Sequence, residues 1–258
     1  MEHEAAGVVH LRAYGELNDH LPPAWRGRER EIVPPLRSSV KDTLESVGIP
    51  HVEVALLLLN GEPVDWRPLL RAGDRVAAYP QAAGFDFSGV SRVWDPPPRP
   101  PRFVLDVHLG RLAAYLRLLG FDTLYQPVDP KDPALVHAAV EEERVLLTCD
   151  RRLLMHGALR WGRWVRNRQP REQTAEILDR YGLRDLARPF TRCLACNGLL
   201  VPADPARVKR DAPPGALRAH GVEEFSRCPD CGRLFWPGSH TRRMSRLLSA
   251  WGVRGERD

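Results

Sequence analysis

The stretch Phe103-Val-Leu-Asp-Val-His-Leu-Gly-Arg-Leu-Ala-Ala-Tyr-Leu-Arg-Leu-Leu-Gly120 decides the fold of this chain. Its first three residues are an apolar run that predicts a short strand, and Asp106 follows them directly. From Val107 to Leu119 the leucines and alanines recur on one helical stripe. Gly120 then closes the helix, because glycine adopts the left-handed conformation without steric cost. The stretch therefore predicts a strand followed at once by a helix.

The same strand and helix pattern repeats along the next 60 residues or so. Further strands are predicted at 122–125, 145–149 and 164–166, and further helices at 132–143, 151–156 and 170–182. Asp132-Pro133 is typical of a helix start, and Gly182 of a helix end. Repeated units of this length predict a parallel sheet with right-handed crossovers and helices on its faces.

The residues before this region predict a separate α+β domain. The expected order is a strand at 8–14, a helix at 39–47, a strand at 52–59, an Asn60-Gly61 turn and a strand at 73–79. This order resembles the ubiquitin-like β-grasp fold, and in particular the small sulfur-carrier proteins. A carrier needs a C-terminal Gly-Gly, whereas this chain continues past Gly84, so a docking or substrate-guiding module is the preferred interpretation.

Two CxxC pairs, Cys193/Cys196 and Cys228/Cys231, lie 31 residues apart near the C-terminus. Four thiolates on two such turns can surround one tetrahedral Zn²⁺, and the pattern predicts a structural zinc ribbon. Redox motifs or disulfides in an exported protein are the alternative. The polar N-terminus has no signal-peptide pattern, which disfavours export. The fifth cysteine, Cys149, ends an apolar run and is expected to be an inert buried thiol.

These features predict four segments in the 258 residues. They are a ubiquitin-like domain at 1–83, a proline-rich linker at 84–101, a parallel α/β domain at 102–188, and a zinc ribbon with its tail at 189–258. No run of about 18 apolar residues exists, so no membrane span is expected, and the cytoplasm is the expected compartment. Of 38 basic residues 35 are arginine. Arginine suits phosphate binding, but a preference for arginine over lysine can equally result from a GC-rich genome.

Two carboxylates stand at equivalent places in the predicted sheet. Asp106 and Asp150 each follow a parallel strand where a helical segment begins, and ligands of open α/β sheets bind at that edge. Each aspartate could instead be only a helix N-cap. Asp122, Asp129 and Asp132 lie on loops at or near the same edge, and clustered carboxylates suit Mg²⁺ or Mn²⁺. Such an ion can activate water for attack on a phosphodiester.

At these residues the chain resembles the Mut-seven C-terminal RNase family. The resemblance rests on 105–122, on Leu146-Leu-Thr-Cys-Asp-Arg-Arg-Leu153, on the paired zinc knuckles and on Phe235-Trp-Pro-Gly-Ser-His240. It implies a metal-dependent, PIN-like ribonuclease with a C-terminal zinc ribbon, preceded in many members by a ubiquitin-like domain. The matched acids are Asp106 and Asp150.

The sequence departs from the family pattern at Cys149, and it leaves the identity of the third acidic ligand open. Cys149 stands where arginine is usual, which would reduce activity if that arginine contacts phosphate. Arg151 and Arg152 are near enough to replace it. For a third acidic ligand Asp129 is preferred over Asp122, because Asp122 is expected to bond locally to a helix terminus.

Several basic residues are candidates for contact with nucleic acid. They are Arg111, Arg117, Arg151, Arg152 and His240. For Arg111 and Arg117 a solvated helix face or ion pairs with 141–143 is the alternative. In the stretch 160–168 arginines alternate with Trp161 and Trp164; an edge strand with buried tryptophans is preferred there over a base-stacking surface.

The sequence thus predicts a ribonuclease with a structural zinc ion and a catalytic Mg²⁺ or Mn²⁺, and RNA as its partner. A protein, tRNA or ribosome partner for the ubiquitin-like domain is left open. The alternative function is a non-catalytic RNA- or ribosome-binding adaptor that keeps the PIN-like scaffold.

Overall fold

The computed structural model describes residues 7–81, 85–128 and 132–253. The chain divides into two compact units, each formed by two segments. The first unit contains Met1–Pro98 and Pro130–Val165, and the second contains Arg99–Asp129 and Arg166–Asp258. No described helix has the length and apolar character that crossing a membrane would require.

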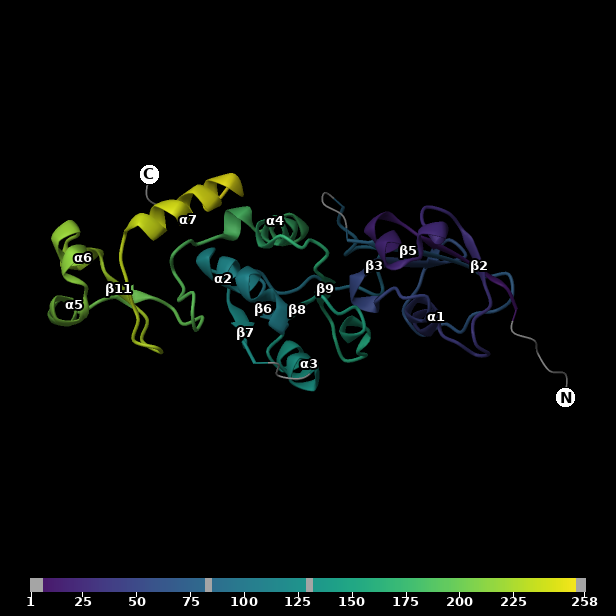
Figure 1. The fold of residues 1–258 in the computed structure, drawn as a ribbon. Helices are drawn as coiled ribbons and strands as arrows, with labels where there is room; N and C mark the ends of the chain where they lie inside the picture. The colour runs from purple at the N-terminus through teal and green to yellow at the C-terminus, as the bar shows by residue number, and fades with distance from the viewer. Residues whose placement is uncertain (1–6, 82–84, 129–131, 254–258) are drawn as a thin grey trace. The chain divides into compact units, whose positions relative to one another are not determined.

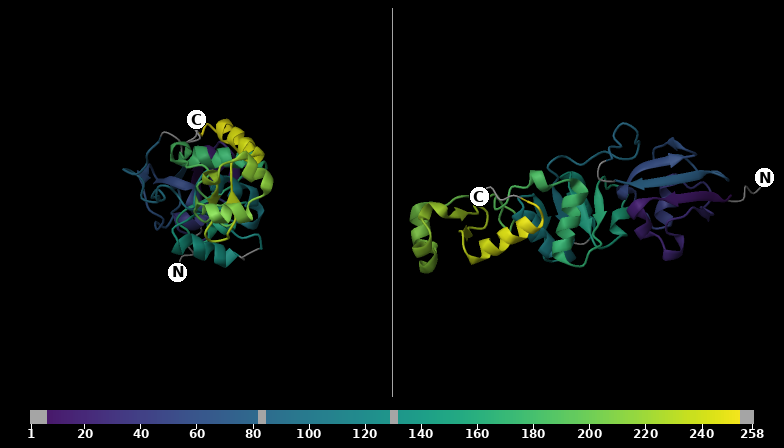
Figure 2. Two further views of the ribbon diagram at one scale, coloured as in Figure 1. Left: turned by 90° about the vertical axis from the view of Figure 1, so that its left-hand side faces the viewer. Right: turned by 90° about the horizontal axis from the view of Figure 1, so that it is seen from above.

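The ubiquitin-like part of the first unit is a mixed five-stranded sheet in the order β2-β1-β5-β3-β4 (Figure 1). Its strands are β1 (Val9–Ala13), β2 (Arg30–Ile32), β3 (Val54–Leu59), β4 (Glu62–Pro63) and β5 (Arg75–Pro80). The central pair, β1 and β5, is parallel, and the other pairs are antiparallel. Figure 2 shows these strands side by side. Strand β2 was not among the predicted elements.

Helix α1 (Val40–Ser46) supplies the other half of this core. The helix begins where the sequence predicts, because Ser39 and Asp42 form a reciprocal capping box. Val40 and Leu44 are fully buried against the sheet residues Leu11 and Leu57 in one apolar cluster. The alternation of buried and half-buried residues along β1 and β5 is the two-residue period of a strand with one face on the core.

The middle of the chain forms parallel β-structure flanked by helices, as predicted. In the second unit β6 (Phe103–Leu105) pairs in parallel with β7 (Thr123–Tyr125). In the first unit β8 (Val145–Thr148) pairs in parallel with β9 (Gly162–Trp164). The flanking helices are α2 (Gly110–Leu118), α3 (Asp132–Glu141) and α4 (Pro170–Tyr181).

Three boundaries differ from the sequence-based expectation. The helix after Asp106 starts as a 3-10 turn, Val107–Leu109, before α2 begins. The segment predicted as a helix at 151–156 contains only the 3-10 turn Leu153–Met155. Strand β9 begins at Gly162 rather than at Trp164, because Gly162 and Arg163 are buried in the β8 pairing. Residues 85–101, the described part of the linker expected at 84–101, contain no helix or strand, while the four domain limits remain predictions.

The C-terminal module is a small antiparallel sheet with helical insertions. Strands β10 (Val201–Pro202), β11 (Ser226–Arg227) and β12 (Leu234–Phe235) pair in that order. In the sequence, helices α5 (Pro205–Asp211) and α6 (Pro214–Ala219) lie between the two CxxC pairs, and α7 (Ser239–Ala250) follows the second pair. Val208 and Phe225 are buried in the core of this module. The remaining 3-10 turns are Gly15–His20, Pro23–Trp25, His51–Glu53, Arg184–Leu186 and Val222–Glu224.

Within the first unit, charged side chains join the ubiquitin-like elements to β9. The Glu53 carboxylate accepts the backbone N–H of Trp164 and contacts His20, both at 2.6 Å. Arg163 makes a bidentate pair with Glu16 at 2.6 and 2.7 Å. Glu53 and Arg163 are 1% and 3% exposed, so this network is shielded from water. Arg163 is therefore a structural residue, and within 160–168 the predicted edge strand covers Gly162–Trp164, with Trp161 buried but Trp164 only half-buried.

Candidate functional site: a four-cysteine centre and two strand-end aspartates

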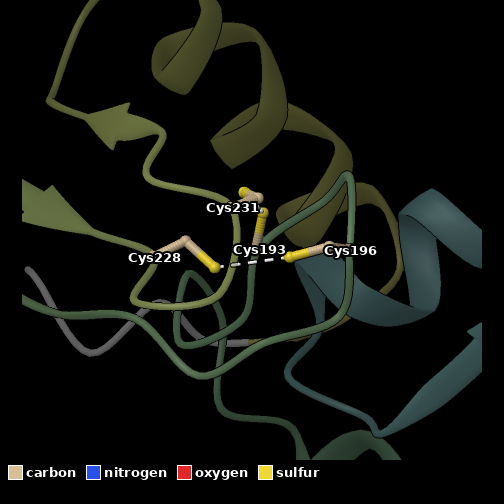
Figure 3. Close-up of side chains that lie close together, drawn as sticks. All are labelled: Cys193, Cys196, Cys228 and Cys231. Carbon is tan, nitrogen blue, oxygen red and sulfur yellow. Dashed lines mark hydrogen bonds between the residues drawn. The ribbon is translucent and has the colours of Figure 1, made fainter.

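The four cysteines of the CxxC pairs converge in the second unit (Figure 3). Their sulfur atoms all lie within 4.8 Å of one another, with 3.6 Å between Cys193 and Cys231 and 3.3 Å between Cys196 and Cys228. A tetrahedral zinc ion with Zn–S bonds of about 2.3 Å requires sulfur atoms about 3.8 Å apart. The four thiols therefore fit one metal ion, and all five cysteines are free of disulfides.

Both cysteine turns have the same backbone design. In each, the residue after the second cysteine donates its N–H to the carbonyl of the first: Asn197 to Cys193 at 3.0 Å and Gly232 to Cys228 at 2.9 Å. Asn197 and Gly232 adopt φ values of 77° and 74°, the left-handed region that asparagine and glycine tolerate best.

The surroundings also favour a thiolate at one of these positions. The pKa of Cys231 is lowered to about 7, chiefly because its sulfur accepts a hydrogen bond from the backbone N–H of Arg233. A deprotonated sulfur is the form that binds a metal ion.

Arg117 supports the first cysteine turn from helix α2. Its Nη1 donates to the carbonyls of Leu194 and Ala195 at 3.1 and 2.9 Å, and its Nε donates to the carbonyl of Thr123 at 3.0 Å. The side chain is 4% exposed, and burial lowers its pKa. The sequence-based expectation that Arg117 contacts nucleic acid is therefore wrong, because its donors are used inside the protein.

Asp122 is likewise engaged with the first cysteine turn. Its Oδ1 accepts a hydrogen bond from Asn197 Nδ2 at 2.9 Å, and its Oδ2 lies 3.6 Å from Arg192. Both partners belong to the first cysteine turn, 70 and 75 residues further along the chain, so these bonds are not the local contact with a helix terminus that the sequence suggested. Asp129, the preferred third acid, lies outside the described residues.

Asp106 and Asp150 occupy the strand ends where the sequence places them. Asp106 follows β6, is 7% exposed, and accepts the backbone N–H of His108 at 2.9 Å. Asp150 follows β8 by two residues, is exposed, and accepts the backbone N–H of Arg152 at 2.8 Å. Asp106 belongs to the second unit and Asp150 to the first. Asp106 is the N-cap of the 3-10 turn Val107–Leu109, whereas Asp150 lies two residues before Arg152, the N-cap of the turn Leu153–Met155.

The other candidates fall into two groups. Arg151 donates to the carbonyl of His20 at 3.2 Å and lies over the ring of Trp164, so it contributes to packing in the first unit. Arg111, Arg152 and His240 are exposed. Cys149 is exposed too, which contradicts the expectation of a buried thiol. The apolar run ends one residue earlier, at Thr148, so the side chain of Cys149 leaves the core.

Comparison with known families agrees with this arrangement. Residues 101–248, more than half of the chain, match the Mut7-C RNAse domain.

The chain belongs to the Mut7-C RNAse family.

Residues 6–86 match a second model, the Mut7-C ubiquitin domain, so the predicted ubiquitin-like module is confirmed. Searches of curated proteins and of solved structures found no significant match. The Mut7-C RNAse match spans both strand-end aspartates and all four clustered cysteines. The family is one of nucleases, which suggests RNA as the substrate class.

Sequence reasoning missed two sets of residues around these sites. Asn197 joins a cysteine turn to β7. Its position directly after CxxC weakly predicts a left-handed turn, because asparagine tolerates that conformation. Glu53 and Glu16 carried none, since their partners at β9 are more than 100 residues away in the chain.

Proposed function

We propose that this chain is a metal-dependent ribonuclease that hydrolyses phosphodiester bonds of RNA, with Asp106 and Asp150 as ligands of a Mg²⁺ or Mn²⁺ ion. The main support is that the Mut7-C RNAse match covers the segment holding both aspartates, with Asp106 directly beyond β6 and Asp150 two residues beyond β8. Carboxylate oxygens are the ligands these cations prefer. When bound, such an ion activates the attacking water and neutralises charge at the phosphorus.

The residues of the chain would orient this chemistry. The backbone N–H groups of His108 and Arg152 each donate to one carboxylate oxygen of an aspartate and would orient that aspartate toward the ion. Asp129 stays the proposed third acid. Arg111, Arg152 and His240 are exposed and would bind flanking phosphates, because guanidinium groups form paired hydrogen bonds with phosphate oxygens.

We further propose that the ion of the four-cysteine centre is Zn²⁺ and that its role is structural. Four thiolates complete a tetrahedral shell, so no position remains for water or substrate. Its contribution would be to hold the ribbon together and to position the exposed side chains that follow it. The cytoplasm, a reducing compartment, is the proposed location because these thiols must stay reduced.

The test is cleavage of single-stranded RNA by the purified protein in Mn²⁺ or Mg²⁺. Asp106→Asn and Asp150→Asn are each expected to lower kcat/KM about 100-fold or more, since each removes a charge from the ion's ligands. Asp185→Asn, an exposed aspartate on a 3-10 turn of the same domain, is the matched control and should leave the rate unchanged. Unchanged cleavage by Asp106→Asn would exclude the proposed site. Salt-dependent RNA binding by the wild type without any cleavage would instead select the adaptor function.

A further inference from the structure

A cavity of about 310 Å³ lies in the second unit, apart from the cysteine centre and from Asp106. Three helices form its walls: α2 through Arg111 and Tyr115, the start of α4 through Gln169, Arg171 and Glu172, and α7 through Arg243. A volume of this size is at the lower end of the range of small-ligand pockets.

Arginine side chains dominate the charge of this cavity. Three arginines line it against a single carboxylate, that of Glu172. Within the described residues, the guanidinium groups of Arg111, Arg171 and Arg243 have no hydrogen bond or ion pair. Elsewhere in the same unit the half-buried Arg184 and the exposed Arg210 pair with aspartates. Three arginines that line one cavity with a single carboxylate are a composition that suits phosphate binding.

The walls of the cavity are fixed by buried aromatic contacts. Trp251, which ends α7, is 6% exposed and donates its indole N–H to the carbonyl of Arg171 at 3.0 Å. The ring of Tyr115 packs edge-on against Trp251 with 5.2 Å between centroids. Arg184 Nε donates to the carbonyl of Trp251 at 2.8 Å. These contacts hold α7 against the start of α4, so the three arginines are presented by a preformed frame.

We propose that this cavity is a phosphate-binding subsite for RNA, in which Arg111, Arg171 and Arg243 bind one phosphate group of the bound strand. The charge of the cavity and the nuclease family of the domain indicate that the bound phosphate belongs to RNA. This proposal rests on the proposed function, in which RNA is the ligand. Tyr115 supplies an aromatic surface beside the arginines, which suits the sugar or base attached to that phosphate.

The experiment compares two double variants that remove the same charge. Arg171→Gln with Arg243→Gln empties the cavity of two guanidinium groups. Arg242→Gln with Arg246→Gln removes two exposed arginines of α7 that do not line the cavity. Binding of a 3′-labelled single-stranded RNA is measured by fluorescence anisotropy at several salt concentrations, without added Mg²⁺ or Mn²⁺. Circular dichroism melting confirms that each variant is folded.

The cavity pair is expected to weaken RNA binding about tenfold or more and to reduce the salt slope by about 1.4, while the control pair changes binding much less. Equal losses in the two pairs, or RNA binding unchanged by the cavity pair, would overturn the proposal. Binding is measured without the catalytic ion, so the two proposals can fail separately. RNA binding that depends on the cavity, together with no cleavage by the wild type, would refute only the proposed ribonuclease activity. Cleavage of RNA whose binding does not depend on the cavity would refute only the phosphate subsite.

Competition separates the possible sources of the phosphate. If an RNA with a 5′-terminal phosphate competes more strongly than the same RNA without it, and only in proteins with an intact cavity, the bound group is a chain end. Equal competition by the two RNAs assigns an internal phosphodiester. A nucleoside monophosphate that binds in a cavity-dependent way while RNA does not would overturn the RNA assignment.

Discussion

The side-chain oxygen of Asn197 accepts the backbone N–H of Thr123 at 2.9 Å, and this bond joins a cysteine turn to the start of strand β7. The amide nitrogen of the same side chain donates to Asp122 at 2.9 Å. Arg117 bonds the carbonyl of Thr123 and the carbonyls of the cysteine turn. The metal-binding turn and the parallel β-structure of the second unit are therefore one hydrogen-bonded assembly.

Asn197→Gly is expected to lower the free energy of unfolding by about 1–3 kcal/mol, because the buried N–H of Thr123 loses its acceptor. Glycine keeps the left-handed backbone, so the loss reports the side chain alone. Asn197→Ala keeps a Cβ at positive φ but lacks the polar side chain that lets asparagine tolerate this conformation, so it should cost about 1 kcal/mol more than the glycine variant. Urea unfolding measures both. A glycine variant as stable as the wild type would show that water satisfies Thr123 equally well.

Removal of the metal from the four-cysteine centre should loosen β7 as well as the ribbon. The reason is that the turn formed by Cys193 and Cys196 presents Asn197 and two carbonyls to β7 and α2. Hydrogen exchange after chelation is expected to accelerate at Thr123–Tyr125 and in the ribbon, and to stay unchanged in the sheet of β1, β3 and β5. Cys149→Ser is the control, since this exposed thiol lies outside the cluster. Unchanged protection of β7 in the chelated protein would contradict the coupling.

Arg117→Met should destabilise the protein by about 2–4 kcal/mol, since it leaves buried carbonyls without donors. Its effect on the salt dependence of RNA binding should be nil, because the guanidinium is enclosed. Arg152→Met, at an exposed arginine, is expected to do the reverse: no loss of stability and a salt slope smaller by about 0.7. Thermal melting and RNA titrations distinguish the two. A reduced slope for Arg117→Met in a folded protein would restore its assignment as a phosphate contact.

Glu53→Ala is expected to cost about 3–5 kcal/mol, because it removes the buried carboxylate that binds the N–H of Trp164 and the ring of His20, while Arg163 keeps its pair with Glu16. Glu53→Gln keeps one acceptor and should cost less. Glu31→Gln, an exposed residue of β2, is the matched control. Differential scanning calorimetry gives the order of stabilities. A similar melting temperature for all three variants would mean that the network contributes nothing to the packing of the ubiquitin-like elements on β9.

Cys149→Arg restores the residue that the family pattern favours beside Asp150. The position is exposed, so arginine fits without disturbing the core. We expect kcat/KM for RNA to rise by about tenfold, the effect of one added charge-assisted contact with phosphate. Cys149→Ser removes the thiol without adding charge and should leave kcat/KM unchanged. An arginine variant no faster than the serine variant would show that Arg152 already fills this role.

Much of the fold could be predicted from local patterns. The strand and helix around Asp106, the capping box at Ser39 and the glycine after α4 depend on residues a few positions apart, so the sequence displays them directly. The pairing of the two CxxC motifs was also predictable, because a metal ion with four thiolates imposes one arrangement. The 3-10 turn at Leu153–Met155 was mistaken for a helix, since short apolar runs look alike in either state.

The sequence by itself therefore determined the domain types, the cysteine centre and the two strand-end aspartates. Only the tertiary structure decided which arginines serve the fold and which face solvent. Arg117 and Arg111 occupy the same helix, yet one is buried against a cysteine turn and the other lines an open cavity. The partners that separate them lie far away in the chain, and no local pattern records them. Side-chain burial depends on these long-range contacts, whereas helix and strand formation depends mainly on neighbours.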